Sequence, residues 1–168
     1  MSIQKFLAAI LLVVGLTSSM PAADSRIDVS QIIGKTEAAE VLGEPVKDPT
    51  PRSGEGAGGY YSKCNYYTVR RAKSLVIRFQ LPGPNAVPPR TELDLLEAAN
   101  GTMEKVSGIG DAAQILVSSG DSGIASRILM LYVAKGNAFL TIGLGGFVDD
   151  AVALEKAKAV AQKLLERL

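Results

Sequence analysis

The sequence predicts an α+β fold, in which a single domain over residues 24–168 forms a sandwich of one antiparallel sheet with about five strands packed against two or three helices. Strand-like segments follow one another in groups, and the helical segments lie between the groups instead of after every strand. The connectors within the groups are short and contain turn residues, as in hairpins. A chain of this length can bury about 70 per cent of its unfolded surface in one core.

Residues 1–23 have the layout of a secretory signal peptide. Lys5 carries the only charge, an apolar run covers residues 6–16, and small and polar residues lead to Ala23. A spanning helix needs about 20 apolar residues, so we expect no permanent membrane span once the signal is cleaved. An uncleaved N-terminal anchor is the alternative. The mature chain is therefore expected to be periplasmic or secreted.

The first expected helix lies within residues 28–46. Thr36 is a candidate internal N-cap, and Gly43, followed by Glu-Pro, marks the end of the helix. The next segment, residues 46–59, is rich in Pro, Gly and Ser and has no hydrophobic period, which predicts a flexible loop.

A hairpin follows, with strands expected at residues 60–69 and 74–81, where apolar and polar side chains alternate. The connector 70–73 is short enough for a tight turn. A proline-rich stretch then interrupts the sheet, because proline has no amide to donate. The second helix is expected at residues 91–101, with Thr91 as its cap.

Three further strands are expected near residues 113–118, 125–134 and 138–144, joined by the turn-like strings GDSG and KGN. The second of these strands has apolar side chains on both faces, which predicts a central position covered on both sides. The last expected helix covers residues 149–168, with its apolar positions mainly on one face.

Several of these segments together resemble a known group of proteins. They are the helix TEAAEVLGEPV, the strand string Cys64-Asn65-Tyr66, the turn VSGIGDAA, the hairpin LYVAKGNAFLTI and the Ala-rich C-terminal helix. In these the chain resembles secreted bacterial proteins and lipoproteins grouped under domains of unknown function, best populated in actinobacteria, whose folds are similar to PsbP-like α/β sandwiches. The resemblance implies a single sandwich outside the cytoplasm and brings no catalytic residue with it. The lipobox cysteine of the lipoprotein members is missing here.

The composition removes several chemistries. The chain has no His and one Cys, so Ser-His-Asp triads, Cys-His pairs, His-containing zinc sites and CxxC motifs cannot be built. We expect no metal and no cofactor. The acids at loop positions are interpreted as solvated turns and helix caps: Asp111, Asp121, Asp149 and Asp150. The string GIGDAA lacks a phosphate-loop continuation and predicts a tight turn, with Gly108 and Gly110 at positive φ.

Cys64 is the lone thiol of a chain expected to be exported. It lies on the same strand face as Tyr66, where a cysteine acts as a small buried hydrophobe. The alternatives are a disulfide between two chains and a reactive thiol.

The charge distribution is uneven, although the mature chain is neutral. Between Gly56 and Thr91 there are six basic residues, no acid and four of the five tyrosines. Such a stretch can bind a polyanion by charge, with aromatic faces adding contact. The hairpin over residues 60–78 therefore supplies the candidate ligand-binding residues Tyr61, Lys63, Tyr67, Arg70, Arg71, Lys73 and Arg78. The competing interpretations are a solvated edge hairpin that discourages aggregation and pairing with the acidic helix after Thr91.

These observations favour an exported, non-enzymatic binding or accessory module of the bacterial envelope. The expected partner is an anionic envelope component or an acidic protein, whereas export argues against nucleic acid. One alternative is a hydrolase or lyase that uses Asp or Glu, Tyr or Lys without His. Another is a structural envelope subunit that associates with itself. The sequence leaves the oligomeric state open.

Overall fold

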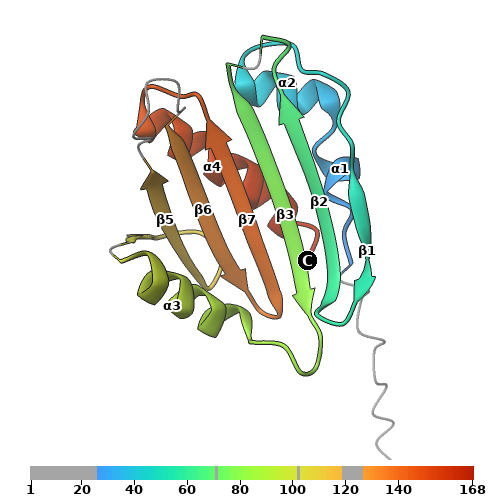
Figure 1. The fold of residues 1–168 in the computed structure, drawn as a ribbon, viewed down its shortest axis with the longest axis vertical. Helices are drawn as coiled ribbons and strands as arrows, with labels where there is room; N and C mark the ends of the chain where they lie inside the picture. Colours follow the sequence, from blue (N-terminus) through green and yellow to red (C-terminus); the bar gives the residue numbers. More distant parts are fainter. Residues whose placement is uncertain (1–25, 71, 102, 119–126) are drawn as a thin grey trace, which may run out of the picture.

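The computed structural model describes residues 26–70, 72–101, 103–118 and 127–168 (Figure 1). They form one seven-stranded antiparallel sheet in the order β1-β2-β3-β7-β6-β5-β4, with four helices. The elements are α1 (Val29–Ile32), α2 (Lys35–Leu42), β1 (Arg52–Gly56), β2 (Gly59–Tyr67), β3 (Ser74–Pro82), α3 (Pro89–Asn100), β4 (Glu104–Val106), β5 (Ala112–Ser118), β6 (Ile128–Lys135), β7 (Ala138–Gly145) and α4 (Asp150–Leu165). The α+β class with an antiparallel sheet is confirmed, but the sheet has seven strands instead of about five, and there are four helices instead of two or three.

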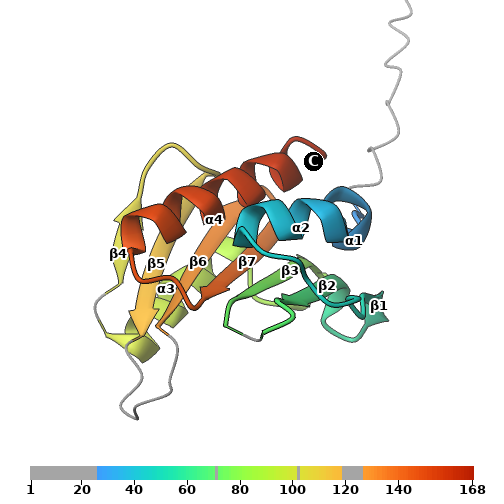
Figure 2. The same cartoon turned by 90° about the horizontal axis from the view of Figure 1, so that it is seen from above.

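The helices lie on both sides of the sheet. Figure 2 shows α1, α2 and α4 together on one side and α3 on the other. On the sheet, α4 contacts mainly β6 and β7, and α3 contacts mainly β6 and β5. On the α3 side, β1, β2 and β3 therefore keep an uncovered surface. We call it the open face; the residues on it are Arg52, Gly54, Tyr61, Lys63, Asn65, Tyr67, Ser74, Val76, Arg78 and Gln80.

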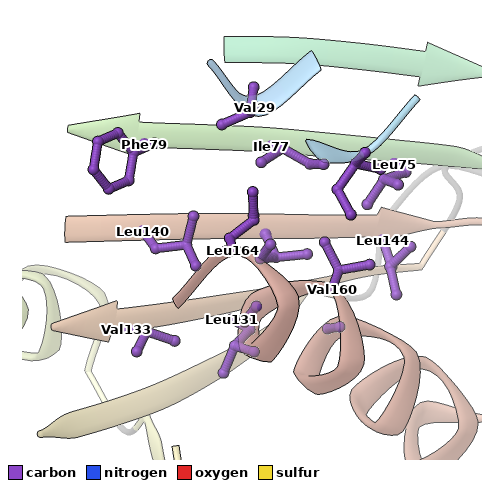
Figure 3. Packing of buried hydrophobic residues seen from close by; sticks show 14 of the residues in the cluster. Val29, Leu75, Ile77, Phe79, Leu131, Val133, Leu140, Leu144, Val160 and Leu164 are labelled. Carbon is purple, nitrogen blue, oxygen red and sulfur yellow. The ribbon is translucent and has the colours of Figure 1, made fainter. Parts of the chain in front are cut away.

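The main core lies between the sheet and the helices α1, α2 and α4. Figure 3 shows side chains of β3, β6 and β7 pointing toward Val29 of α1 and toward Val160 and Leu164 of α4. Ile77 of β3 and Ile142 of β7 are fully buried there. Because a buried side chain of this size contributes about 1.5–3 kcal/mol, this layer holds the helices in place. None of the helices in the described ranges is long and apolar enough to cross a membrane.

The strand expected near residues 125–134 corresponds to β6, and its predicted central position in the sheet is confirmed. β6 lies between β7 and β5. Its residues Leu129, Leu131 and Val133 are buried in the α4-side core, while Ala134 packs with α3 in a second, smaller cluster. The two-sided apolar pattern of this strand therefore reflects helices on both faces, except at its first residue, Ile128, which is exposed.

The prediction of a flexible loop over residues 46–59 is wrong in its second half. β1 occupies Arg52–Gly56 and pairs with β2, and an isolated bridge joins Val46 to Thr68. β1 is an edge strand with mostly exposed side chains, so backbone pairing holds it without a hydrophobic period. β4 was not expected for a similar reason, because it has three residues and no buried side chain.

Both predicted threonine caps are also wrong. Gly34 is the N-cap of α2, so Thr36 lies inside the helix. Pro88 is the N-cap of α3 and Pro89 its first residue, because the fixed φ of proline suits the first helical turn. The expected helix end at Gly43 is confirmed by its φ of 71°. The GDSG turn lies outside the described residues.

Candidate functional site

The tyrosines of the predicted hairpin point to opposite sides of the sheet. Side chains alternate along a strand, so Tyr61 and Tyr67 lie on the open face while Tyr60 and Tyr66 point toward the helices. The hydroxyl of Tyr60 donates a hydrogen bond to the carbonyl oxygen of Ile27 at 2.9 Å. That of Tyr66 donates to the carbonyl oxygen of Ile33. The tyrosines of the helix side therefore have structural roles, and only the other two can meet a ligand on the open face.

Three cations stand directly opposite one another across neighbouring strands of the open face. Arg52 of β1 pairs in register with Lys63 of β2, and Lys63 pairs with Arg78 of β3. Adjacent strands lie about 4.8 Å apart, so the three positions form a short line across the sheet. All three residues are exposed. We call this set the cationic row.

The open face contains no acidic residue on β1, β2 or β3. Glu55 points to the opposite side of β1 and forms an ion pair with Arg26 at 2.6 Å. Burial raises the pKa of Glu92 on α3, and the charge of Arg78 acts against this shift. For Arg52 and Lys63, the described part of the chain offers no ion-pair partner. Arg52 and Lys63 thus combine exposure with an uncompensated positive charge, whereas Arg78 also interacts with the carboxyl group of Glu92.

A hollow of about 300 Å³ adjoins the row at the edge of β2. Its lining includes Arg52 and Lys63, together with the polar side chains of Thr50, Asn65 and Tyr67. The one acid in the lining is Asp48, which is fully exposed and bonds to Lys35 at 2.5 Å. This hydrogen bond and the charge of Lys35 lower the pKa of Asp48. The hollow therefore offers two cations beside hydroxyl and amide groups, which suits a small anionic group with hydroxyl neighbours.

Arg52 was not among the candidate residues predicted from sequence. It lies in the segment that was interpreted as a loop, eleven positions from Lys63. Only the pairing of β1 with β2 brings the two side chains together. The AGG string between Gly56 and Tyr60 was the one local signal of a turn there.

Lys73 does not belong to the open face. Its ammonium group donates to the carbonyl oxygen of Leu42 at 3.0 Å, lies 3.4 Å from the carboxylate of Glu44 and sits 5.3 Å from the ring centroid of Phe147. Lys73 therefore completes the C-terminal end of α2. Arg70 is exposed in the β2–β3 turn, and Arg71 lies outside the described residues. Of the seven predicted residues, the structure brings four together on the open face: Tyr61, Lys63, Tyr67 and Arg78.

Cys64 is buried, as expected, with 1% of its surface exposed. Burial raises the pKa of the thiol, and burial likewise raises the pKa of the neighbouring Tyr66 hydroxyl. The thiol is therefore protonated at neutral pH and shielded from reagents in the folded chain.

The GIGD turn is also as expected. Gly108 and Gly110 have φ values of 77° and 60°. The Asp111 carboxylate accepts hydrogen bonds from the Gly136 amide at 2.6 Å and from the Lys135 ammonium at 2.8 Å, and both lower the pKa of Asp111. The turn is thus fastened to the β6–β7 hairpin.

The acids near α4 also make contacts within the chain. Asp149 caps the helix by accepting hydrogen bonds from the amides of Ala151 and Val152 at 2.8 and 3.2 Å. Asp150 forms an ion pair with Arg127 at 2.5 Å. Asp121 lies outside the described residues. In the described ranges, no group of three or more His, Cys, Asp or Glu side chains is placed to hold a metal ion.

Comparison of the chain with models of known protein families and with curated proteins finds no match. What the site can do therefore follows from its charge and shape. The cationic row and the adjoining hollow form an exposed, polar, positively charged surface at one edge of the sheet.

Proposed function

We propose that this chain is an exported, non-enzymatic binding or accessory module of the bacterial envelope, which holds an anionic envelope component on the cationic row. The periplasmic or secreted location and the PsbP-like sandwich belong to the same proposal. They are supported by the layout of residues 1–23 and by the resemblance of the mature chain to secreted bacterial proteins.

The register of Arg52, Lys63 and Arg78 carries the proposal. Like charges directly opposite each other on neighbouring strands destabilise a sheet. A row of three such charges without acids among them therefore costs stability in the free protein. A bound anion removes this repulsion, so the arrangement favours an anionic ligand.

The hollow beside the row supports a ligand with defined polar groups. Thr50, Asn65 and Tyr67 line it, next to two of the three cations. Hydrogen bonds to hydroxyl groups of the ligand would add to the attraction between charges. A phosphate- or carboxylate-bearing glycan or lipid head group combines these features.

Retention on an immobilised phosphate resin tests the proposal. Because the mature chain has equal numbers of acidic and basic residues, retention at low salt depends on a local patch and not on net charge. We expect the triple variant Arg52→Ser, Lys63→Ser, Arg78→Ser to elute at clearly lower salt than the parent chain. The melting temperature should show that both proteins are folded.

The matched control removes three basic residues from other surfaces: Lys105, Lys156 and Arg167, each replaced by Ser. Its net charge equals that of the first variant. Equal losses of retention in the two triple variants would show that overall charge, and not the cationic row, binds the anion, and the proposal would then be wrong.

A further inference from the structure

Exposed apolar side chains gather at one end of the molecule. Five of the eight large hydrophobic residues that are exposed in the described ranges lie where β2 ends, β6 begins and β7 leads into α4. We call this set the turn end; it consists of Tyr67, Val69, Ile128, Val148 and Val152. In Figure 1 this end is at the top, where β2 and β7 finish and β3 and β6 start. Such a gathering marks a contact surface more often than scattered single residues do.

The two turns that project from this end lie against each other. A Cβ atom on Gly146 would come within 1.9 Å of the carbonyl oxygen of Ala72, so the β7–α4 turn touches the β2–β3 turn. The position of Lys73 over the ring of Phe147 shows the same contact. Val69 and Val148 therefore project from neighbouring turns, and Val148 is 95% exposed.

Three of the acids near this end make contacts within the chain, whereas Glu40 of α2 is exposed beside Glu44 and has no ion-pair partner in the described ranges. Glu44 pairs with Lys73, Asp150 pairs with Arg127, and Asp149 caps α4. Arg70 follows Val69 directly, is exposed, and has no ion-pair partner in the described part of the chain. The β2–β3 turn therefore presents the apolar side chain of Val69 next to the positive charge of Arg70.

We propose that the turn end inserts shallowly into the surface of an anionic lipid bilayer. Apolar side chains beside cations are the combination that binds such a surface, where the apolar groups enter the boundary of the acyl chains and the cations meet the head groups. A stable protein partner would need about 20–30 residues on each side. The turn end offers five side chains on separate turns, which a deformable bilayer accommodates without a complementary hollow.

This inference rests on the proposed function in one respect, namely that the cationic row binds anions. The hollow beside Arg52 and Lys63 extends to Tyr67, which belongs to the turn end. When the apolar tips enter the bilayer, the hollow therefore lies toward the head groups. The envelope component bound by the row is then an anionic lipid held at the membrane surface.

Sedimentation with vesicles tests the inference. The chain beginning at residue 24 is suitable, because the buried residues of both described clusters lie between Ile27 and Leu164. We expect it to sediment with vesicles of equal parts phosphatidylglycerol and phosphatidylcholine, and much less with phosphatidylcholine alone. The double variant Val69→Ser, Val148→Ser should bind the anionic vesicles at least about tenfold more weakly, because two exposed apolar contacts are lost. The matched control is Val87→Ser with Leu95→Ser, which removes exposed apolar side chains elsewhere and should bind like the parent.

Retention on the phosphate resin separates this inference from the proposed function. A chain that is retained on the resin but does not sediment with anionic vesicles refutes membrane docking and leaves anion binding intact. Unchanged vesicle binding of the Val69/Val148 variant, or equal binding to neutral vesicles, also refutes it. A chain that binds neither resin nor vesicles refutes both. Loss of vesicle binding in the Val69/Val148 variant with unchanged retention on the resin supports the inference.

Discussion

At the scale of single residues, Tyr66 connects β2 to the helix layer. Its ring is fully buried, and its hydroxyl donates to the carbonyl oxygen of Ile33, the residue that ends α1. Ser62 makes a second such link, because its hydroxyl accepts a hydrogen bond from the amide of Val29 at 3.0 Å. Each of these bonds connects residues 33 positions apart. Together they fix the position of β2, and so of its open-face side chains, relative to the helix layer.

We expect Tyr66→Phe to lower the free energy of unfolding by about 1–2 kcal/mol, because the buried carbonyl group of Ile33 loses its hydroxyl donor while the ring stays in place. Urea unfolding measures the change. Tyr61→Phe is the matched control on the same strand, since the Tyr61 hydroxyl makes no hydrogen bond within the described residues. Its cost should stay within about 0.5 kcal/mol. Equal costs for the two variants would contradict the role assigned to Tyr66.

Single-residue predictions succeeded where the reason was local. The burial of Cys64 follows from its position on an apolar strand face, and the positive φ of Gly108 and Gly110 follows from the turn string around them. The sequence grouped Lys73 with the other cations of the hairpin, but its ammonium group reaches the carbonyl oxygen of Leu42, 31 positions earlier, and not the open face. No local pattern shows that a helix end lies within reach of that side chain.

At the scale of elements, the turn between β4 and β5 depends on one glycine much more than on the other. A Cβ atom on Gly110 would lie 2.4 Å from Cγ1 of Val133 and 2.7 Å from the carbonyl oxygen of Ala134. At Gly108 nothing lies within 4 Å. Both residues have positive φ, so the difference between them is a difference of packing against β6.

We therefore expect Gly110→Ala to cost more than about 2 kcal/mol, because the backbone penalty for a left-handed alanine is joined by a clash with β6. Gly108→Ala should cost about 1 kcal/mol, since it carries the backbone penalty alone. The midpoints of chemical unfolding measure both values. If the two substitutions cost the same, the close approach of the turn to β6 is wrong.

The elements that the sequence predicted well are those with one buried face. In β3, Leu75, Ile77 and Phe79 alternate with more exposed residues, and the pattern corresponds to the core face of the strand. β1 has no such alternation, because its side chains are exposed or partly exposed and its pairing is made by backbone groups. A strand of this kind leaves no hydrophobic pattern in the sequence, so the pairing of β1 with β2 could not be predicted from the sequence.

At the scale of the whole molecule, the fold rearranges the charges that the sequence groups by position. The basic stretch between Gly56 and Thr91 appears as one cluster along the chain. In the fold, its side chains are divided between the two faces of the sheet and the turn at the end of the β2–β3 hairpin, because side chains alternate along each strand. Arg52, which lies outside that stretch, joins the cationic row through the β1–β2 register. The sequence could therefore predict that this hairpin is basic, but not which cations lie side by side.

The repulsion within the cationic row gives a last prediction about the stability of the whole domain. Lys63 stands between Arg52 and Arg78, so Lys63→Gln removes two unfavourable cross-strand pairs, each costing roughly 0.2–1 kcal/mol. We expect the variant to melt at a higher temperature than the parent chain in low salt. The gain should fade as salt is raised, because the screening length falls from about 10 Å at 0.1 M to about 3 Å at 1 M. Lys105→Gln is the control, since Lys105 lies opposite the uncharged Gln114 and should give no gain. A polyanion should reverse the order, stabilising the parent more than the Lys63 variant, because a ligand that binds the folded state more tightly raises its stability more, with the logarithm of the affinity. A Lys63 variant that gains nothing in low salt, or a polyanion that stabilises both chains equally, would show that these three cations do not act on one another or on a common ligand.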